Sequence, residues 1–439
     1  MIKKTIKIVL LNIAVFLLLF CIVESLSSAM LIYWDHVNER RHPQHKDPYT
    51  GKLVRAEKIG NRYLGERYAP YSLAQIYYKN DKSESPQGLY TDQYGFVHNG
   101  DPYRDLREKL ESGRRVFLFG GSSVVGANST TSNTRTIASF LERSLRKKHD
   151  ARDQVVNAAV EGYESFRDFI LAAHLVGQFD MDILIFLNGR NDWYRLTATD
   201  SFYHNYYPET EALYARLSGL PVNASRGFIE SLSVVKFMKK LKSSKRFKKG
   251  NVHPVLSTAY KQKRIPRDIN TINPEELFRS SPDGWSYRKN LTHRPQAVKN
   301  YIDNLRSIAG LCSAHKKRCI IALQPTLGYG DRELHEDEEE YLETLPFENW
   351  IQTQNEFYDQ ARDEFKKLSE EYKGTSIEFI DLTSLFDDSK ERIFLDSIHY
   401  LDNGNSILGT ALASQIIHND WKRYRNCCTE SLVESVQEQ

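Results

Sequence analysis

The order of apolar and polar residues from position 115 onward predicts alternating strands and helices. Five short apolar runs are typical of buried parallel strands: 116–119, 155–156, 183–187, 319–323 and 377–380. Five longer amphipathic stretches predict helices: 135–148, 165–177, 296–313, 349–371 and 403–418. Strands joined by helical crossovers predict an α/β fold, a three-layer α/β/α sandwich around a five-stranded parallel sheet of the flavodoxin-like type.

The segments outside this alternation suggest how the chain is divided. Residues 35–110 are polar and tyrosine-rich, and their prolines interrupt any long helix, so we expect an irregular wrapping segment. The alternation also stops between residues 195 and 295, which predicts an insertion or cap within a domain spanning 111–425. Residues 426–439 would then form a tail.

The first 34 residues resemble a membrane anchor or an export signal. Three lysines within the first seven residues precede an apolar run of 27 residues, 8–34, against the roughly 20 needed to cross a bilayer as a helix. We expect an uncleaved signal-anchor, a transmembrane helix with its lysines in the cytoplasm and the rest of the chain periplasmic or extracellular. The alternative is a secreted protein, because Ser27 and Ala29 form a small-x-small pair that a signal peptidase could accept.

Charge and cysteine content exclude several classes of partner. Sixty basic and 57 acidic residues leave a formal charge of +3, too balanced for a dedicated nucleic-acid binder. The five cysteines include no Cys-x-x-Cys pair, so we expect no structural zinc site, and we predict no metal and no cofactor. Cys312 and Cys319 could pair outside the cytoplasm, whereas Cys427 and Cys428 are harder to place, and the sequence leaves the pairing open.

Two charged runs have competing interpretations. Residues 236–249 hold eight bases and no acid beside an apolar stripe, which is compatible with a helix on a membrane surface, with an anionic glycan, or with a solvated basic face. The acidic run at 336–340, with Glu343, predicts a solvated helix start. Carboxylates adjacent in sequence do not converge on one calcium ion.

Polar clusters stand where the predicted strands end, and the carboxyl ends of parallel strands share one edge of the sheet. Ser122 follows the first strand and two glycines, which allow a tight turn that exposes its hydroxyl. A neutral serine is a weak nucleophile and needs a base. His399 can take its proton, and Asp396 can orient the imidazole and stabilise its charged form.

Serine attack on an acyl carbon creates an oxyanion that needs hydrogen-bond donors aimed at it in advance. Asn191 offers a side-chain amide after the third strand, and Gly162 offers a backbone N–H after the second. The Ser122 backbone N–H can supply a third donor. The three groups come from three strand ends and can converge on one point.

These residues resemble the four blocks of the SGNH hydrolase superfamily, the GDSL-like lipases and esterases, which supply serine, glycine, asparagine and histidine in this order. The resemblance covers 115–194 and 296–418 and is to the Gly-Gly-Ser variant, because Gly121 replaces the aspartate of Gly-Asp-Ser. Residues 90–96 also look like the lead-in of exported, membrane-anchored bacterial members. The resemblance implies a catalytic triad of Ser122, Asp396 and His399, and an oxyanion hole of the Ser122 amide, Gly162 and Asn191.

This pattern predicts a serine esterase that acts outside the cytoplasm and removes acyl groups, most plausibly acetyl, from a cell-envelope or secreted glycan through an acyl-enzyme. An O-acyltransferase would use the same residues but pass the acyl group to a sugar hydroxyl. A lipase or lysophospholipase would act on a lipid ester instead, and a catalytically silent binding subunit would keep the fold without turnover. Besides substrate, we expect the membrane as a partner through the N-terminal helix, with a possible contribution from 236–249.

Overall fold

The computed structural model describes residues 15, 18–31, 33, 45–54, 58–61, 65–77, 87–127, 129–198, 295–345 and 349–419. The chain divides into two compact units, residues 1–44 with 207–258, and residues 45–206 with 259–439. Of the first unit, only helical residues between 15 and 33 are described. No helix in the described ranges is both long and apolar enough to cross a membrane, and part of the predicted anchor, including residues 8–14, lies outside them.

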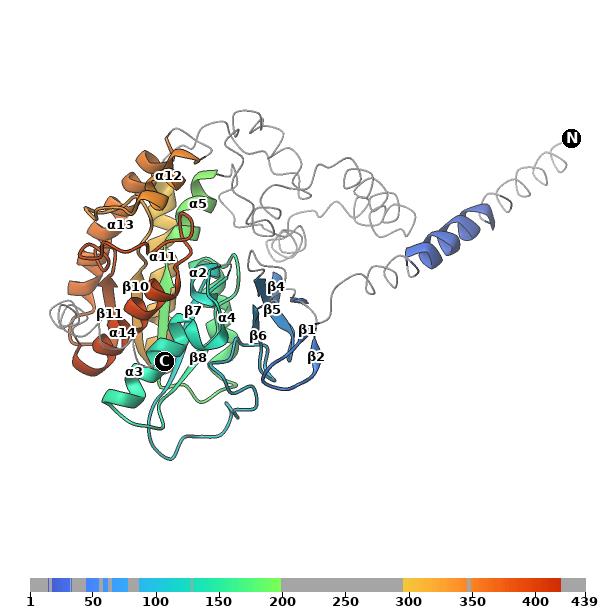
Figure 1. Ribbon diagram of the computed structural model, residues 1–439, viewed down its shortest axis with the longest axis horizontal. Helices are drawn as coiled ribbons and strands as arrows, with labels where there is room; N and C mark the ends of the chain where they lie inside the picture. The colour runs from blue at the N-terminus through green and yellow to red at the C-terminus, as the bar shows by residue number, and fades with distance from the viewer. Residues whose placement is uncertain are drawn as a thin grey trace, which may run out of the picture. The chain divides into compact units, whose positions relative to one another are not determined.

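A five-stranded parallel sheet forms the centre of the second unit (Figure 1). Its strands are β7 (Arg115–Gly120), β8 (Gln154–Asn157), β9 (Ile183–Asn188), β10 (Arg318–Leu323) and β11 (Ile377–Asp381). Their order across the sheet is β8-β7-β9-β10-β11, the flavodoxin-like arrangement, and β7 pairs with both β8 and β9. The predicted parallel sheet is confirmed. Its switch point, where ligands bind in such folds, lies between β7 and β9.

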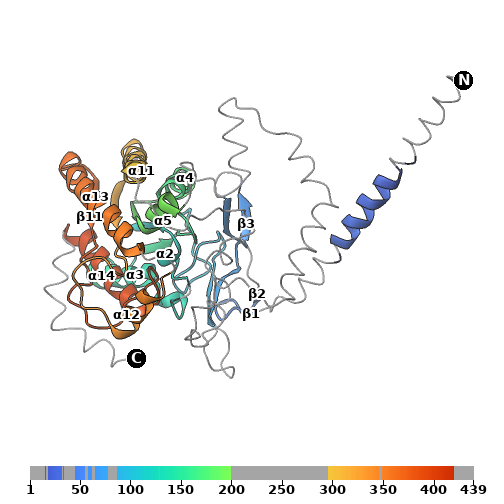
Figure 2. The same cartoon turned by 90° about the horizontal axis from the view of Figure 1, so that it is seen from above.

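Helices cover both faces of this sheet (Figure 2). Phe117 and Phe119 of β7 pack on the side of α4 (Ser165–Leu175), α11 (Pro295–Ala314) and α13 (Trp350–Glu371). Val116 and Leu118 point to the opposite side, where α3 (Ile137–Lys148) and α14 (Asp402–His418) lie. Because both faces of the strand are buried, its sequence is continuously apolar rather than alternating. The predicted three-layer α/β/α sandwich is therefore confirmed.

The segment before β7 is more regular than the expected irregular wrapping. Its described residues form three two-stranded antiparallel sheets: β1 (His45–Lys46) with β2 (Leu53–Val54), β3 (Lys58–Asn61) with β4 (Gly65–Tyr68), and β5 (Leu73–Tyr77) with β6 (Gln87–Tyr90). Strands of two to five residues are too short to show an apolar period in the sequence. Almost all of the predicted insertion at 195–295, the whole basic segment at 236–249 and the tail at 426–439 lie outside the described residues.

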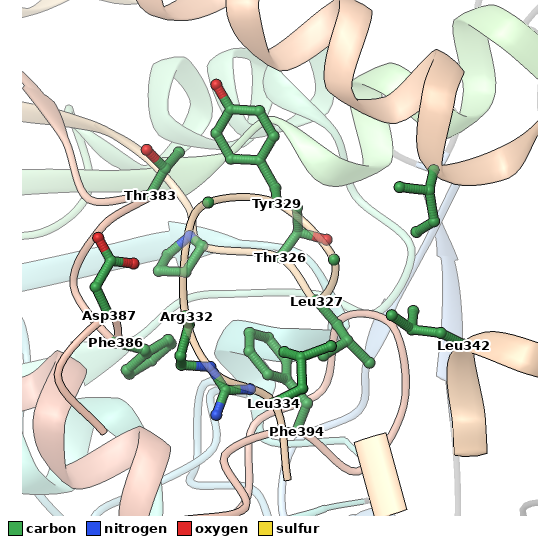
Figure 3. A pocket seen from close by; sticks show the side chains of 14 residues that line it. Thr326, Leu327, Tyr329, Arg332, Leu334, Leu342, Thr383, Phe386, Asp387 and Phe394 are labelled. Atoms are coloured by element: carbon green, nitrogen blue, oxygen red, sulfur yellow. The ribbon is translucent and has the colours of Figure 1, made fainter. Parts of the chain in front are cut away.

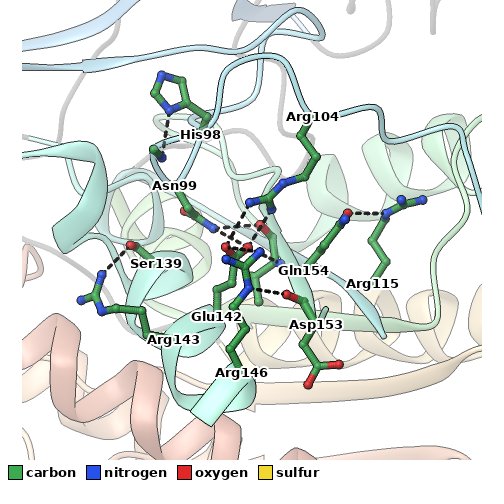
Figure 4. A network of polar contacts seen from close by, with 12 residues as sticks. His98, Asn99, Arg104, Arg115, Ser139, Glu142, Arg143, Arg146, Asp153 and Gln154 are labelled. Atoms are coloured by element: carbon green, nitrogen blue, oxygen red, sulfur yellow. Dashed lines mark hydrogen bonds and ion pairs between the residues drawn. The ribbon is translucent and has the colours of Figure 1, made fainter. Parts of the chain in front are cut away.

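A buried carboxylate ties the segment before β7 to the sandwich (Figure 4). Glu142 of α3 is 4% exposed and accepts two hydrogen bonds from the Arg104 guanidinium, at 2.7 and 3.0 Å. It also accepts the backbone N–H of Val155 at 2.8 Å and the Asn99 amide at 3.3 Å, and it pairs with Arg146 at 3.1 Å. One side chain thus joins the lead-in segment, α3 and β8.

A disulfide closes the junction between α11 and β10. Cys312 and Cys319 are bonded to each other, and both are buried. The pairing that the sequence left open is therefore formed between these two residues. Cys21 is free, and Cys427 and Cys428 lie outside the described residues.

Glu142→Ala should lower the free energy of unfolding by about 3 to 5 kcal/mol, because it leaves the partly buried Arg104 without this counter-charge and the buried Val155 N–H without its acceptor. Urea denaturation of the full chain measures the change. Asp363→Ala is the control, since Asp363 is an exposed residue that pairs with the exposed Lys366, and it should leave stability close to that of the parent. If the two variants change the free energy of unfolding equally, Glu142 does not join these segments in the way described.

Candidate active site

Ser122 lies at the carboxyl end of β7, on the switch point of the sheet. It is the first residue of a short helix, α2 (Ser122–Val125), and is 9% exposed. The preceding Gly121 is needed for space: a Cβ there would meet Asn191 Nδ2 and would lie 2.9 Å from the carbonyl oxygen of Tyr163. In this arrangement a side chain at position 121 would press against the backbone of Tyr163, so glycine fits this position best.

The structure brings Ser122, His399 and Asp396 into one chain of hydrogen bonds. His399 Nε2 lies 2.8 Å from Ser122 Oγ, and His399 Nδ1 lies 2.7 Å from Asp396 Oδ2. An ionised carboxylate can only accept, so Nδ1 carries the hydrogen, and Nε2 is left to accept from the serine hydroxyl. The second oxygen of Asp396 accepts the backbone N–H groups of Ile398 and His399, both at 2.9 Å. The carboxylate is thereby fixed in place.

The electrostatics of this pair favour an ionised aspartate and a basic imidazole. Burial alone would raise the pKa of Asp396, but the His399 ring and the two backbone N–H groups together bring it below its ordinary value. Burial lowers the pKa of His399, and the charge and hydrogen bond of Asp396 more than compensate, so the pKa of the imidazole is raised. His399 is therefore a stronger base than a free histidine.

The loop that carries Asp396 and His399 is held from the side of β10. Thr326 Oγ1 donates to the carbonyl oxygen of Ser397 at 3.0 Å, and Leu327 N–H donates to the same oxygen at 3.3 Å. Further along, Tyr400 Oη donates to the carbonyl oxygen of Pro325 at 2.7 Å. These bonds fix the position of the imidazole relative to the sheet.

Glu338 supports the same loop and corrects one sequence interpretation. It lies in α12 (Glu336–Glu343), within the acidic run predicted to be solvated, yet it is 1% exposed. Its Oε1 accepts the backbone N–H groups of Ile393 at 2.9 Å and Phe394 at 2.8 Å, and its Oε2 pairs with Arg332. The sequence feature that could have singled out Glu338 is its position three residues after His335, because the two side chains form a helix-capping box. That signal predicts a helix start and gives no sign of burial.

The three candidate oxyanion donors lie on neighbouring strand ends. The Ser122 N–H is in the first turn of α2, where helices leave N–H groups without an intrahelical partner. Gly162 follows β8 with φ of +76°, a left-handed backbone that favours glycine. Asn191, in α5 (Arg190–Ala198), donates to the carbonyl oxygen of Tyr163 at 2.7 Å, and its amide has a second hydrogen for a ligand. The loop after β8 and α5 are thus bonded to each other.

A second contact strengthens this junction. The buried Asp192 of α5 accepts the backbone N–H of Ser165 at 3.2 Å and also the Ser165 hydroxyl. Burial raises the pKa of Asp192 to about 7, although the Ser165 hydrogen bonds oppose the rise. The sequence pattern indicated no separate role for Asp192, because Ser165, its hydrogen-bond partner, follows a different strand of the sheet.

A pocket of about 250 Å³ lies nearby but contains none of these groups (Figure 3). Its walls come from the segments after β10 and β11 and from α12 and α13, and include Leu327, Tyr329, Thr383 and Phe394. Because no triad member or candidate oxyanion donor lines it, we assign it no part in the reaction. Within the described ranges, no group of three or more His, Cys, Asp or Glu side chains is placed to hold a metal ion.

No protein-family model matches the chain, and no curated protein matches it. Solved structures similar to it include an acetylxylan esterase from Geobacillus stearothermophilus, at 12% identity and a TM-score of 0.35, covering 72% of this chain and 98% of that one. A protein described as a GDSL-like lipase from Parabacteroides merdae has 13% identity and a TM-score of 0.34, with 73% and 99% covered. A protein described as an acylhydrolase from Bacteroides fragilis has 9% identity and a TM-score of 0.34, with 71% and 90% covered.

Asn191→Ala should lower kcat for an activated ester by about 10²- to 10³-fold with little change in KM, because the amide stabilises charge that develops only in the transition state. Steady-state kinetics on the full chain measure both constants. Asn300→Ala, the same chemical change on α11, is the matched control and should behave as the parent. Equal rates for the two variants would exclude an oxyanion role for Asn191.

The pH profile should report His399, because only the neutral imidazole can accept the serine proton. As its pKa is raised, kcat/KM should fall with decreasing pH around a midpoint above the ordinary imidazole value of about 6.5. Asp396→Asn removes the charge that raises this pKa. The acid limb should therefore move to lower pH, with a loss of rate of up to about 10⁴-fold. An acid limb at the same pH in both proteins would contradict the assignment.

Proposed function

We propose that this chain is a serine esterase that removes acyl groups, with acetyl as the first candidate, from a glycan outside the cytoplasm. The observation that carries the proposal is the Ser122–His399–Asp396 hydrogen-bond chain beside the amide of Asn191. A serine hydroxyl bonded to a histidine, which is itself oriented by a carboxylate, is the arrangement that acyl transfer requires. Adjacent donors allow it to stabilise an oxyanion.

The reaction follows from the directions of these hydrogen bonds. His399 Nε2 accepts the proton of Ser122 Oγ as that oxygen attacks the ester carbonyl, and the resulting oxyanion faces the Ser122 and Gly162 N–H groups and the Asn191 amide. Collapse breaks the bond to the leaving oxygen, which receives the proton from His399. Water then attacks the acyl-enzyme by the same route, and the acid and free Ser122 are released.

Export of the catalytic unit is part of this proposal. The lysines followed by a long apolar run at the N-terminus are typical of an exported or anchored chain. The Cys312–Cys319 disulfide supports the same location, since such bonds persist in oxidising compartments and are rare in the cytosol. An enzyme held at the cell envelope reaches the acylated glycans and lipid esters found there.

The test incubates the purified full chain, and its Ser122→Ala variant, with an acetylated glycan, with the deacetylated glycan plus an acetyl donor, and with a lysophospholipid. Acetate released from the first substrate by the parent and not by the variant is the expected result. Acyl transfer to the deacetylated glycan would make the protein an O-acyltransferase, and fatty acid from the third would make it a lysophospholipase. The first outcome would replace hydrolysis by transfer, and the second would replace the glycan by a lipid ester. Equal activity of parent and variant would exclude Ser122 as the nucleophile.

Location is tested separately. We expect the full chain to remain in the membrane fraction after alkaline carbonate washing, with its N-terminal lysines retained. A chain that begins at residue 35 should stay in the supernatant. A mature protein that is released by the wash and begins at Met30 would show cleavage after Ala29 instead of anchoring.

A further inference from the structure

Arg190 is an unusual residue for its surroundings. It is the first residue of α5, directly before Asn191, and is only 4% exposed. It forms no ion pair with a described carboxylate, and its Nε–H is buried without a hydrogen-bond partner among the described residues. Burial lowers the pKa of this guanidinium. The charge of Asp396 opposes this lowering, but no described carboxylate lies within ion-pair distance of Arg190. A buried charge without a direct ion pair is costly, and an apolar side chain of similar volume would fill the space at lower cost.

Aromatic rings form the walls around this cation. The guanidinium carbon lies 4.3 Å from the centre of the Trp193 ring, 5.0 Å from that of Trp350 and 5.6 Å from that of Tyr194. Cation–π contacts recover part of the desolvation cost and restrict where the guanidinium can lie. The side chain is therefore held in one place by α5 and α13.

A hydrogen bond from Arg190 reaches the acid–base loop. Its Nη2 donates to Ser397 Oγ at 3.2 Å, and Ser397 directly follows Asp396. The backbone oxygen of Ser397 is held by Thr326 and Leu327, on the β10 side. The bond from Arg190 adds a contact from α5, the helix that carries the Asn191 oxyanion donor.

We propose that Arg190 is a positioning residue of the reaction. It holds Ser397, and through Ser397 it holds the Asp396–His399 pair at a fixed position relative to the amide of Asn191. This inference rests on the proposed function and adds to it a residue that does not touch the reacting atoms. It assigns a use to a buried cation that forms no ion pair with a described carboxylate.

The charge of Arg190 has a second, measurable effect. The groups that face the catalytic pair are Glu161 after β8, Arg190 on α5, and Tyr341 on α12, which faces Asp396. Burial lowers the pKa of His399, Asp396 and Glu161 raise it, and Arg190 lowers it. Removing the cation should therefore raise this pKa and move the acid limb of kcat/KM to higher pH.

The experiment compares Arg190→Met, Arg190→Lys and Ser397→Ala with the parent full chain on a small activated acetyl ester. Arg190→Met should lower kcat about tenfold to a hundredfold with little change in KM, and should move the acid limb to higher pH. Arg190→Lys keeps the charge but loses the planar guanidinium and its paired N–H groups. Its acid limb should therefore stay near that of the parent, while its kcat should lie between those of the parent and Arg190→Met. Ser397→Ala should lower kcat without moving the limb.

Arg143→Met is the matched control. Arg143 also lies over an aromatic ring, Phe140, at 4.4 Å, but on α3, away from the acid–base loop. It should keep the kcat and the pH profile of the parent. If Arg190→Met has the same kcat and the same acid limb as the parent, the proposal is overturned. A second pattern would also overturn it: kcat falls in Arg190→Met, Arg190→Lys does not restore it, and the acid limb does not move. That pattern is expected of a residue that only stabilises the fold.

A readout that does not need turnover separates this inference from the esterase proposal. The pKa of His399 is measured by NMR titration of histidine-labelled chain, with the resonance assigned by its absence in His399→Gln. If the parent hydrolyses no ester, the proposed function fails, while a higher pKa of His399 in Arg190→Met would still place Arg190 at the pair. An unchanged pKa of His399 would overturn the inference whatever the parent does to esters.

Discussion

The 2.8 Å contact between His399 Nε2 and Ser122 Oγ is the interaction on which the account of this site depends, and it joins residues 277 positions apart. The sheet makes it possible, because β7 places Ser122 at its carboxyl end and the loop before α14 returns the chain to the same edge. Contacts from Glu338, Thr326 and Arg190 then fix that loop. A misplacement of about 1 Å at such a contact costs on the order of 10²-fold in rate.

Burial decides how these polar contacts act. In a partly buried site, the carboxylate of Asp396 and the amide of Asn191 interact more strongly with developing charge than they would in solvent. The same burial makes unpaired groups expensive, so the loops are bonded to one another: Asn191 to Tyr163, Asp192 to Ser165. The candidate oxyanion donors and His399 therefore lie at one edge of the sheet, on segments that are bonded to their neighbours.

The sequence predicted the parts of this structure that depend on local pattern. The five strands and the helices between them were predictable because strands buried on both faces are continuously apolar. The meeting of Ser122, His399 and Asp396 at one edge of the sheet was predictable because the ends of parallel strands converge. The hairpins between residues 45 and 90 are too short for a period to show. Glu338 and Arg190 were missed because their partners, Ile393 and Ser397, are distant in sequence, so the burial of both charges depends on tertiary contacts.

The central claim is that Ser122 is a nucleophile activated by His399, and covalent labelling tests it most directly. The full chain is treated with an organophosphorus ester, which phosphorylates activated serines, and the modified peptide is identified by mass spectrometry. The account predicts one phosphoryl group on Ser122, formed much more slowly in His399→Gln. Labelling of the adjacent Ser123 instead, or labelling of Ser122 at the parent rate without His399, would contradict it.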